Sequence, residues 1–369
     1  MSSNIPGVFI KHNKSISQVL DEDFATLFLT FNDINFTNPL IVLKDYSQAN
    51  KYKFIKKDIF LYKAIEVFFA NKGNKLYILN YPIKSKKSFD ILEFENFINR
   101  SCDTLMDLEV VVGLDLYSSN IYNEILGQKY IVSIQRVINN YCTKTNRLSI
   151  TDIPNDFNSK YLDIFGETII YSPWIRDKSS ILLPPSVYVG AMLSKFADQD
   201  KLAASVANKE IFNAIDLESN LTKDEKSILL ENRINPIILV PHQGVRIWGT
   251  KAFDSKVDTT SELRIMKYIK RNLYRIGKAY VFEPNDNNLK DKILMQVENF
   301  LYNLWEKGGL AGKVKDHAYH INGETTITDA NDKILTINIA VALVKPIEFI
   351  YIELNKVAQD GTQSTLSIS

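Results

Sequence analysis

The chain has few of the features that mark common enzymes and binding proteins. Only two of its 369 residues are cysteines, Cys102 and Cys142, and their separation fits neither a zinc-binding pair nor a disulfide framework. We interpret both as small buried apolar side chains. No strand-like segment is followed by GxGxxG or GxxxxGK[ST], so a dinucleotide or P-loop site has no support. The net charge of +1 argues against a strongly basic nucleic-acid-binding protein.

Segments that target or insert a protein into membranes are also missing. Met1–Lys14 has no basic stretch followed by an apolar one, so we expect no signal peptide and synthesis in the cytoplasm. No apolar run approaches the roughly 18 residues that would cross a bilayer. We therefore expect no direct insertion into a membrane.

What is present predicts an α/β or α+β protein that is long enough for two domains. The 18 tyrosines and 20 phenylalanines favour strands and large contact surfaces, and the length allows two domains. Between residues 21 and 183, strand-like and helix-like segments alternate, which predicts a mostly parallel sheet covered by helices. The expected strands are Thr26–Phe31, Leu40–Leu43, Leu76–Tyr81, Leu108–Leu114, Leu148–Ile153 and Thr168–Ser172, and the expected helices are Ile59–Ala70, Phe89–Met106 and Ile121–Cys142.

The Pro-Pro pair at Pro184 and Pro185 marks a boundary, after which further helices and strands are expected. The expected helices are Val187–Phe196, Thr222–Asn232, Glu262–Lys278 and Leu289–Lys307, and the expected strands are Ile237–Val240, Val245–Gly249, Tyr280–Phe282 and His317–Asn322. Thr222 and Glu225 have the spacing of a capping box.

Two further strands near the end of the chain, Ile334–Leu343 and Ile347–Leu354, suggest pairing between molecules. They are separated at Lys345-Pro346, where proline has no N–H to donate. A strand near a chain end is free to add to the sheet of another molecule. Ile5–Ile10 is a second such segment, although composition alone favours pairing within its own chain.

The helix Glu262–Lys278 carries an apolar stripe and a basic one. Its basic residues are Arg264, Lys267, Arg271 and Arg275. Such a stripe is usually a solvated face, and the alternative is a docking surface for an acidic partner.

No group of residues predicts catalysis or metal binding. His317 and His320 form the nearest approach to a zinc site, but no further ligand stands at a supporting spacing. His242, Ser255 and Asp254 match no nucleophile or protease signature. We therefore assign no catalytic, cofactor-binding or metal-binding residue and expect that the protein is not an enzyme.

Several ordered sequence blocks resemble the contractile tail sheath proteins of phages, R-type pyocins and related injection particles. In order they are Pro6–Phe9 ("PGVYV"), Phe68–Gly73 ("FF-NGG"), Tyr171–Trp174 ("YYPW"), Leu183–Ser186 with Val189–Ala191 ("PPSG…AG-Y"), Ile234–Pro236 with Gly244–Gly249 ("IN…G-G-R-WG"), Tyr280–Asn285 ("FEPN"), Phe300–Gly312 ("FL--LW--GAL-G") and Val344–Ile350 ("KPAEFI"). The blocks reach both ends and the middle of the chain. The pattern departs at Pro241–Gly244, where an arginine of the family is replaced, and at Leu202–Asn208.

The resemblance implies a two-domain subunit. An inner α/β sandwich domain would be built from both chain ends, with an outer α/β domain inserted. The expected parts are an N-terminal arm (1–16), the outer domain (17–185), the inner domain with its C-terminal strand arm (186–356) and a polar tail (357–369).

The resemblance also implies a structural function. Subunits would form a six-fold helical sheath of stacked rings around an inner tube, and contraction would drive the tube through a target envelope. The expected partners are other copies of the chain, the tube protein, and baseplate and terminator or cap proteins, without nucleic acid or cofactor. Assembly would yield a phage tail or a released tail-like particle of a bacterium.

The resemblance assigns roles to two groups of residues. The exchanged strand arms would contain Ile5, Val8, Phe9, Ile10, Phe349, Ile350, Tyr351 and Ile352. The tube would contact Arg264, Lys267, Arg271 and Arg275. Two alternatives remain at this point: a minor sheath-like protein near the baseplate and, from a different class, an α/β enzyme.

Overall fold

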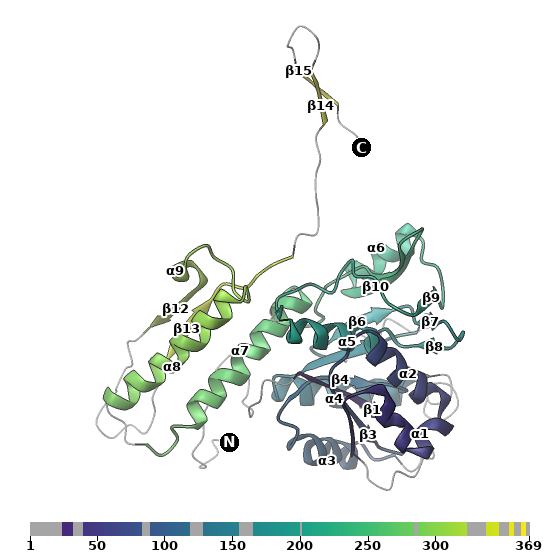
Figure 1. Cartoon of the computed structure of the whole chain (residues 1–369), viewed down its shortest axis with the longest axis horizontal. Coiled ribbons are helices and arrows are strands. Elements are labelled where there is room, and N and C mark those ends of the chain that lie inside the picture. Colours follow the sequence, from purple (N-terminus) through teal and green to yellow (C-terminus); the bar gives the residue numbers. More distant parts are fainter. Residues whose placement is uncertain are drawn as a thin grey trace.

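The fold is organised around an eight-stranded sheet with the strand order β11-β10-β6-β5-β4-β1-β3-β2 (Figure 1). The computed structural model describes residues 24–31, 40–82, 89–118, 128–154, 165–199, 201–283, 287–322, 337–346, 354–357 and 363–366. The strands of this sheet are β1 (Ala25–Thr30), β2 (Leu40–Leu43), β3 (Leu76–Asn80), β4 (Leu108–Gly113), β5 (Leu148–Asp152), β6 (Ile169–Ser172), β10 (Ile234–Val240) and β11 (Gly244–Ile247).

The central strands run parallel and are buried on both faces, as their near-continuous apolar sequences predict. Side chains alternate between two core clusters: Phe28 and Val112 lie in one, whereas Leu27, Leu29 and Val111 lie in the other. Only β2 and β11, at the two edges, run antiparallel to their neighbours.

Helices cover both faces of the sheet. Apolar residues of α2 (Ile59–Ala70) and α5 (Pro185–Asp198) belong to the first cluster, and those of α3 (Ile91–Cys102) and α4 (Gln128–Lys144) belong to the second. The shorter elements around the sheet are η1 (Tyr46–Lys51), α1 (Lys53–Lys57), α6 (Lys223–Glu231) and the three-stranded sheet of β7 (Ile175–Asp177), β8 (Leu182–Leu183) and β9 (Ala214–Leu217).

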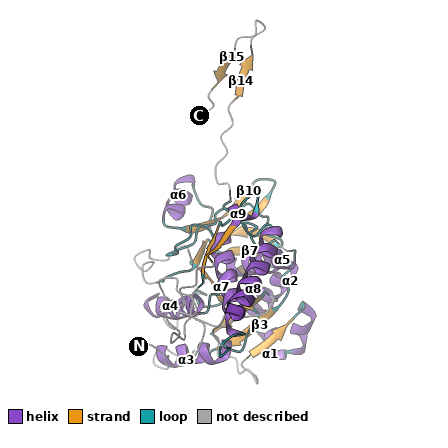
Figure 2. Cartoon of the chain, turned by 90° about the vertical axis from the view of Figure 1, so that its left-hand side faces the viewer, coloured by secondary structure: helices purple, strands orange, loops and turns teal. Residues whose placement is uncertain are grey.

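A smaller C-terminal unit stands beside the sheet (Figure 1). It contains α7 (Thr260–Lys278), α8 (Asn287–Glu306), α9 (Lys315–Ala318), β12 (Tyr319–Asn322) and β13 (Asn338–Val341). Its third core cluster joins the apolar stripes of α7 and α8 to β12 and β13. A last antiparallel pair, β14 (Leu354–Val357) and β15 (Gln363–Leu366), lies apart from both units in two perpendicular views (Figures 1 and 2).

Most of the predicted elements are confirmed. β2 and α2 have the predicted bounds, the capping box of Thr222 and Glu225 is present, and both cysteines are buried. The expected helix Ile121–Cys142 is confirmed from residue 128 onward as part of α4, and residues 121–127 lie outside the described residues. The expected strand Ile347–Leu354 lies outside the described residues except for Leu354. Within the described part of the chain, no helix has the length and apolarity of a membrane span.

Three expectations differ from the structure. Residues 280–282 form a turn instead of a strand, because the N–H groups of Tyr280 and Glu283 donate to Gly277 and Tyr280. The sheet does not end at residue 185: β10 pairs with β6, and the Pro-Pro pair instead starts α5, with Pro185 in the first turn where proline is favoured. Residues 357–369, expected to be only a polar tail, contain β15 and the last residue of β14.

Two buried carboxyl groups at the carboxyl ends of parallel strands give the fold a pH dependence. Asp152 accepts a hydrogen bond from the N–H of Ser186 (2.7 Å), and Asp115 accepts one from Phe31 (2.9 Å). Burial raises the pKa of each carboxyl to about 7, against the lowering effect of these hydrogen bonds. Because the folded pKa exceeds the unfolded one, the protonated forms stabilise the fold, and this stabilisation is lost as pH rises toward 7.

We predict that the melting temperature falls between pH 5.5 and pH 8, and that the fall is smaller in Asp152→Asn and Asp115→Asn. Either amide can still accept the backbone hydrogen bond but does not ionise. Thermal unfolding followed by circular dichroism across this range measures the effect. Asp224→Asn, on the exposed side of α6, is the control and should retain the wild-type slope. Equal slopes in all four proteins would contradict the prediction.

Candidate assembly site

The contact between α7 and the large sheet is built from buried charges. The Arg264 guanidinium donates to both carboxylate oxygens of Glu109 (2.7 and 2.8 Å) and to the carbonyl of Leu193 (2.7 Å). Arg264 and Glu109 are each 1% exposed. Glu109 lies within β4, so this bidentate pair ties the helix directly to the middle of the sheet.

Two further cations of α7 continue this contact. Lys267 pairs with Glu167 (2.5 Å) and donates to the carbonyl of Arg147 (2.8 Å). Arg271 donates to the carbonyl of Asn146 (2.6 Å). Burial acts to raise the pKa of Glu167, but the adjacent Lys267 ammonium lowers it below the usual range.

The predicted basic stripe is therefore not a solvated face. Arg264, Lys267 and Arg271 are buried between α7 and the sheet, and the expectation that they meet acidic groups on a tube is wrong for this arrangement of the chain. Arg275 is half-buried. The apolar stripe of α7 faces α8, so its opposite, basic stripe is the one that faces the sheet. One sequence feature could have revealed this contact. It is Glu109, the single acidic residue in the otherwise apolar segment LEVVVG.

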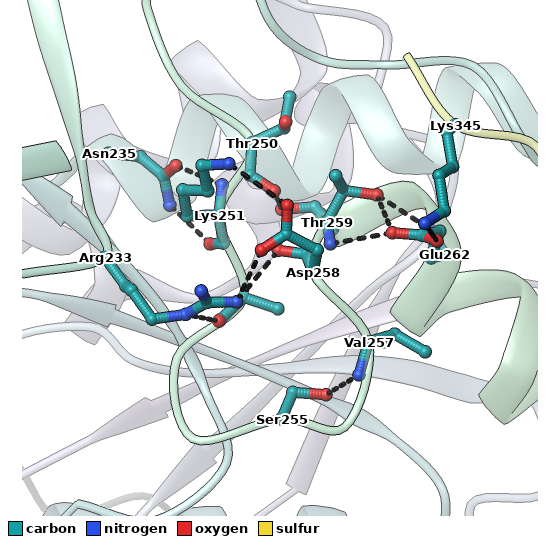
Figure 3. A network of polar contacts seen from close by, with 12 residues as sticks. Arg233, Asn235, Thr250, Lys251, Ser255, Val257, Asp258, Thr259, Glu262 and Lys345 are labelled. Carbon is teal, nitrogen blue, oxygen red and sulfur yellow. Dashed lines mark hydrogen bonds and ion pairs between the residues drawn. The ribbon is translucent and has the colours of Figure 1, made fainter. Parts of the chain in front are cut away.

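A network of polar contacts at the N-terminus of α7 extends from Asn235 of the large sheet to Lys345 (Figure 3). Asn235 of β10 accepts from the N–H of Lys251 (2.6 Å) and donates to its carbonyl (2.8 Å). Asp258 pairs with Lys251 (3.1 Å) and with Arg233 (2.8 Å).

Next along the chain, Thr259 and Glu262 close a capping box on α7. The second carboxylate oxygen of Glu262 lies 3.9 Å from the Lys345 ammonium, one residue before the described residues 337–346 end (Figure 3). Glu262 therefore contacts both the start of α7 and the start of the arm.

The C-terminal unit also contains the sheet of β12 and β13, which has two strands among the described residues. It packs on α8 through half-buried apolar side chains of β13 and the buried Tyr319 of β12. The N–H of Ala342 donates to the carbonyl of Ala318, so the alternation of an antiparallel ladder makes His320–Ala340 and Asn322–Asn338 the hydrogen-bonded pairs. The N–H and C=O of Ile321 therefore face away from β13.

These backbone groups can accept another strand. A two-stranded sheet is marginally stable in water, and an open edge presents a row of donors and acceptors to an extended segment. The residues assigned to the strand arms, Ile5, Val8, Phe9, Ile10, Phe349, Ile350, Tyr351 and Ile352, lie outside the described residues, so their role stays a prediction.

The structure does not gather the remaining candidates into one site. His317 lies in α9 and His320 lies in β12, and both side chains are exposed. Ser255 donates to Glu167 (3.2 Å) and so belongs to the network around Lys267. In the described part of the chain, no cluster of three or more His, Cys, Asp and Glu side chains is positioned to hold a metal ion.

Solved structures with this architecture include chains of contractile particles. The chain is similar to a chain of the anti-feeding prophage baseplate, with a TM-score of 0.75, 18% identity, and coverage of 96% of this chain and 99% of that one. It is similar to a chain of the sheath complex of the extracellular contractile injection system PVC in its contracted state (TM-score 0.71, 18% identity, coverage 98% and 99%). The sheath tail protein from Listeria innocua is a more distant neighbour (TM-score 0.58, 9% identity, coverage 88% and 96%). No curated protein matches the sequence.

The fold is thus that of contractile sheath proteins. Within it, residues 254–355 match the phage tail sheath C-terminal domain, which spans α7, α8, β12, β13 and the start of the arm. The resemblance inferred from the sequence blocks is confirmed.

We predict that breaking the buried pair between α7 and β4 destabilises the subunit strongly. Glu109→Ala leaves Arg264 buried beside no carboxylate, and such changes cost about 3–5 kcal/mol of unfolding free energy. The double variant Glu109→Leu with Arg264→Met should recover most of this loss, because it removes both charges. Urea denaturation measures both values.

The half-buried pair of Lys63 and Glu66 near the surface of α2 supplies the control. Lys63→Ala should cost less than about 1 kcal/mol, as surface ion pairs do. A loss in Glu109→Ala no larger than that of the control would contradict the role assigned to the buried pair.

Proposed function

We propose that the chain is a sheath subunit of a contractile injection system or phage tail. The observation that carries the proposal is the similarity to chains of contractile sheath and baseplate complexes over nearly the full length of both chains. The match of residues 254–355 to the phage tail sheath C-terminal domain supports it. Its subunits form stacked six-fold rings around an inner tube, and contraction of the sheath drives the tube through a target envelope.

The two structural units correspond to the two radial layers of such a sheath. The C-terminal unit of α8, α9, β12 and β13 forms the inner layer, and the unit of the eight-stranded sheet forms the outer layer. The buried charges of α7 support this assignment, since they hold the two units together while neighbouring subunits move. Stored energy then resides in the contacts between subunits, as in other assemblies with two stable arrangements.

The chain ends supply the connections that persist during contraction. Residues 5–10 and 349–354 add as strands to sheets of neighbouring copies, so that main-chain hydrogen bonds hold rows of subunits together. The sheet of β12 and β13, with two strands of its own, is suited to receive them. The partners proposed are other copies, a tube protein, and baseplate and terminator proteins, in a particle assembled inside a bacterium.

A second candidate is a minor sheath-like protein at the baseplate end of the same machine. Its specific support is the similarity to a chain of the anti-feeding prophage baseplate. Such a protein would form a single ring, whereas a main sheath protein would form long tubules. Negative-stain microscopy of the purified chain with its tube protein distinguishes the two.

We predict that removing residues 1–16 or residues 347–369 yields a folded subunit that no longer polymerises. The large sheet and the core of the C-terminal unit lie outside both segments, so circular dichroism and the melting temperature should change little. Size exclusion and negative-stain microscopy measure assembly. As control, Asp224→Asn on α6 should polymerise as the wild type does. Tubules of normal appearance from either deletion would refute the role of that arm.

A further inference from the structure

The contact between α7 and the large sheet holds more buried positive charge than negative charge. Four cations at this contact are each less than one-tenth exposed: Arg147, Arg264, Lys267 and Arg271. Two carboxylates of the described residues pair with them, Glu109 with the two arginines of α7 and Glu167 with Lys267. Burying a charge without a counter-charge is costly, so this excess predicts a further anionic group at the contact.

Two guanidinium nitrogens at this contact have no hydrogen-bond partner in the described part of the chain. Nε and Nη2 of Arg264 donate to Glu109, which leaves Nη1 buried and unpaired. Nη1 of Arg147 is likewise buried and unpaired, while its Nη2 donates to the carbonyl of Leu105 (2.7 Å). Burial lowers the pKa of Arg147 to about 10, and the nearby charge of Arg271 acts in the same direction. Both orphan nitrogens can donate to an added carboxylate.

The first described residue of the chain lies directly beside these groups. The centroid of the Phe24 ring is 5.6 Å from that of Tyr268 on α7 and 5.6 Å from the guanidinium carbon of Arg264. The carbonyl of Phe24 accepts a hydrogen bond from the Ser194 hydroxyl (3.4 Å). The three residues before Phe24, Asp21–Asp23, are all acidic. Consecutive Cα atoms are about 3.8 Å apart, so covalent connection alone keeps this acidic segment near Arg264.

The topology of the sheet favours this segment over other parts of the chain outside the described residues. Phe24, Arg147 and Glu109 lie at the amino ends of β1, β5 and β4, and α7 contacts the sheet there. Segments 32–39, 119–127 and 155–164 instead follow the carboxyl ends of these three strands. Parallel strands place these two kinds of ends at opposite edges of a sheet.

We propose that the acidic segment Asp21–Asp23 docks on the basic stripe of α7 and supplies the missing counter-charge to Arg264, Arg271 and Arg147. A carboxylate accepts planar, charge-assisted hydrogen bonds from guanidinium groups, so it satisfies an unpaired nitrogen and compensates its charge together. The proposal does not depend on the sheath function. It adds a constraint to that function, because the ten residues between this segment and residues 5–10 span at most about 36 Å.

A thermodynamic cycle on the isolated full-length chain tests the proposal. One variant neutralises the segment, one removes a cation by Arg271→Gln, and one combines both sets of changes. The neutral segment carries Asp21→Asn, Glu22→Gln and Asp23→Asn. Urea denaturation measures the folding equilibrium constant of each protein. A control with the same change in net charge carries three substitutions at exposed positions, Asp224→Asn, Asp254→Asn and Asp291→Asn.

Neutralising the segment should lower the folding equilibrium constant about 10-fold or more, as loss of hydrogen bonds to charged groups does. The same change should cost much less in the Arg271→Gln background, and the control should change the constant less than about threefold. Equal losses in both backgrounds, or a loss no larger than that of the control, would overturn the proposal.

Carbodiimide crosslinking identifies the contact without relying on stability. The reagent couples a carboxylate to an amine that touches it, and Arg271→Lys places an amine at the proposed contact. Peptide mapping by mass spectrometry should join position 271 to residues 21–23 in a product with the mass of one chain. The wild-type chain, with no amine at position 271, is the control.

Two crosslinking results would overturn the proposal. Joining of these positions only in a product with the mass of two chains would assign the acidic segment to another copy. Crosslinks from position 271 to Glu109 alone would show that no further carboxylate reaches the stripe. Neither result bears on the sheath function, because the isolated subunit is measured.

Discussion

An antiparallel pair of strands satisfies only half of the backbone hydrogen-bonding groups of each strand, and the other half must find water or another strand. In the C-terminal unit this constraint falls on β12, where the N–H and C=O of Ile321 face away from β13. The same constraint falls on the distant pair of β14 and β15. Much of the proposed assembly follows from these unmet groups, because strand addition satisfies them without any change in the core of the subunit.

Strand addition between copies requires that the two units within each subunit keep a fixed arrangement. α7 fixes this arrangement through two stripes that face in opposite directions. Its apolar stripe packs against α8, and its basic stripe reaches into the large sheet, where Arg264 meets Glu109. Buried ion pairs contribute little net stability, but each fixes a specific geometry, since a misplaced buried charge is costly. Here the geometry fixed is that of the C-terminal unit relative to the sheet.

The sequence predicts local structure well where the signal is local. In α2, apolar residues recur at helical spacing, the Asp58 side chain accepts from the N–H of Leu61 at the helix start, and Gly73 follows shortly after the helix end. The bounds of α2 match the prediction. The sheath resemblance, carried by ordered blocks along the chain, is likewise confirmed. Local propensity fails at Tyr280–Phe282, where backbone hydrogen bonds at the end of α7 impose a turn.

The candidate site depends on contacts that no local pattern contains. Arg264 and its partner Glu109 are 155 residues apart, so the sequence showed a basic stripe without showing what faced it. A Pro-Pro pair is compatible with a domain boundary and with the start of a helix. Here the pairing of β10 with β6 shows that the sheet continues beyond it and that the pair starts α5. The open edge of β12 also required the structure, because an unpaired strand edge has no sequence signature of its own.

Amide hydrogen exchange at Ile321 tests the central claim most directly. Its N–H faces away from β13, whereas the N–H groups of His320 and Asn322 face toward that strand in the ladder. In the isolated subunit we predict rapid exchange at Ile321, and in the assembled polymer a slowing of at least about 100-fold, as expected when an amide becomes part of a stable ladder. Equal exchange rates at Ile321 in the isolated subunit and in the polymer would contradict strand addition at this edge.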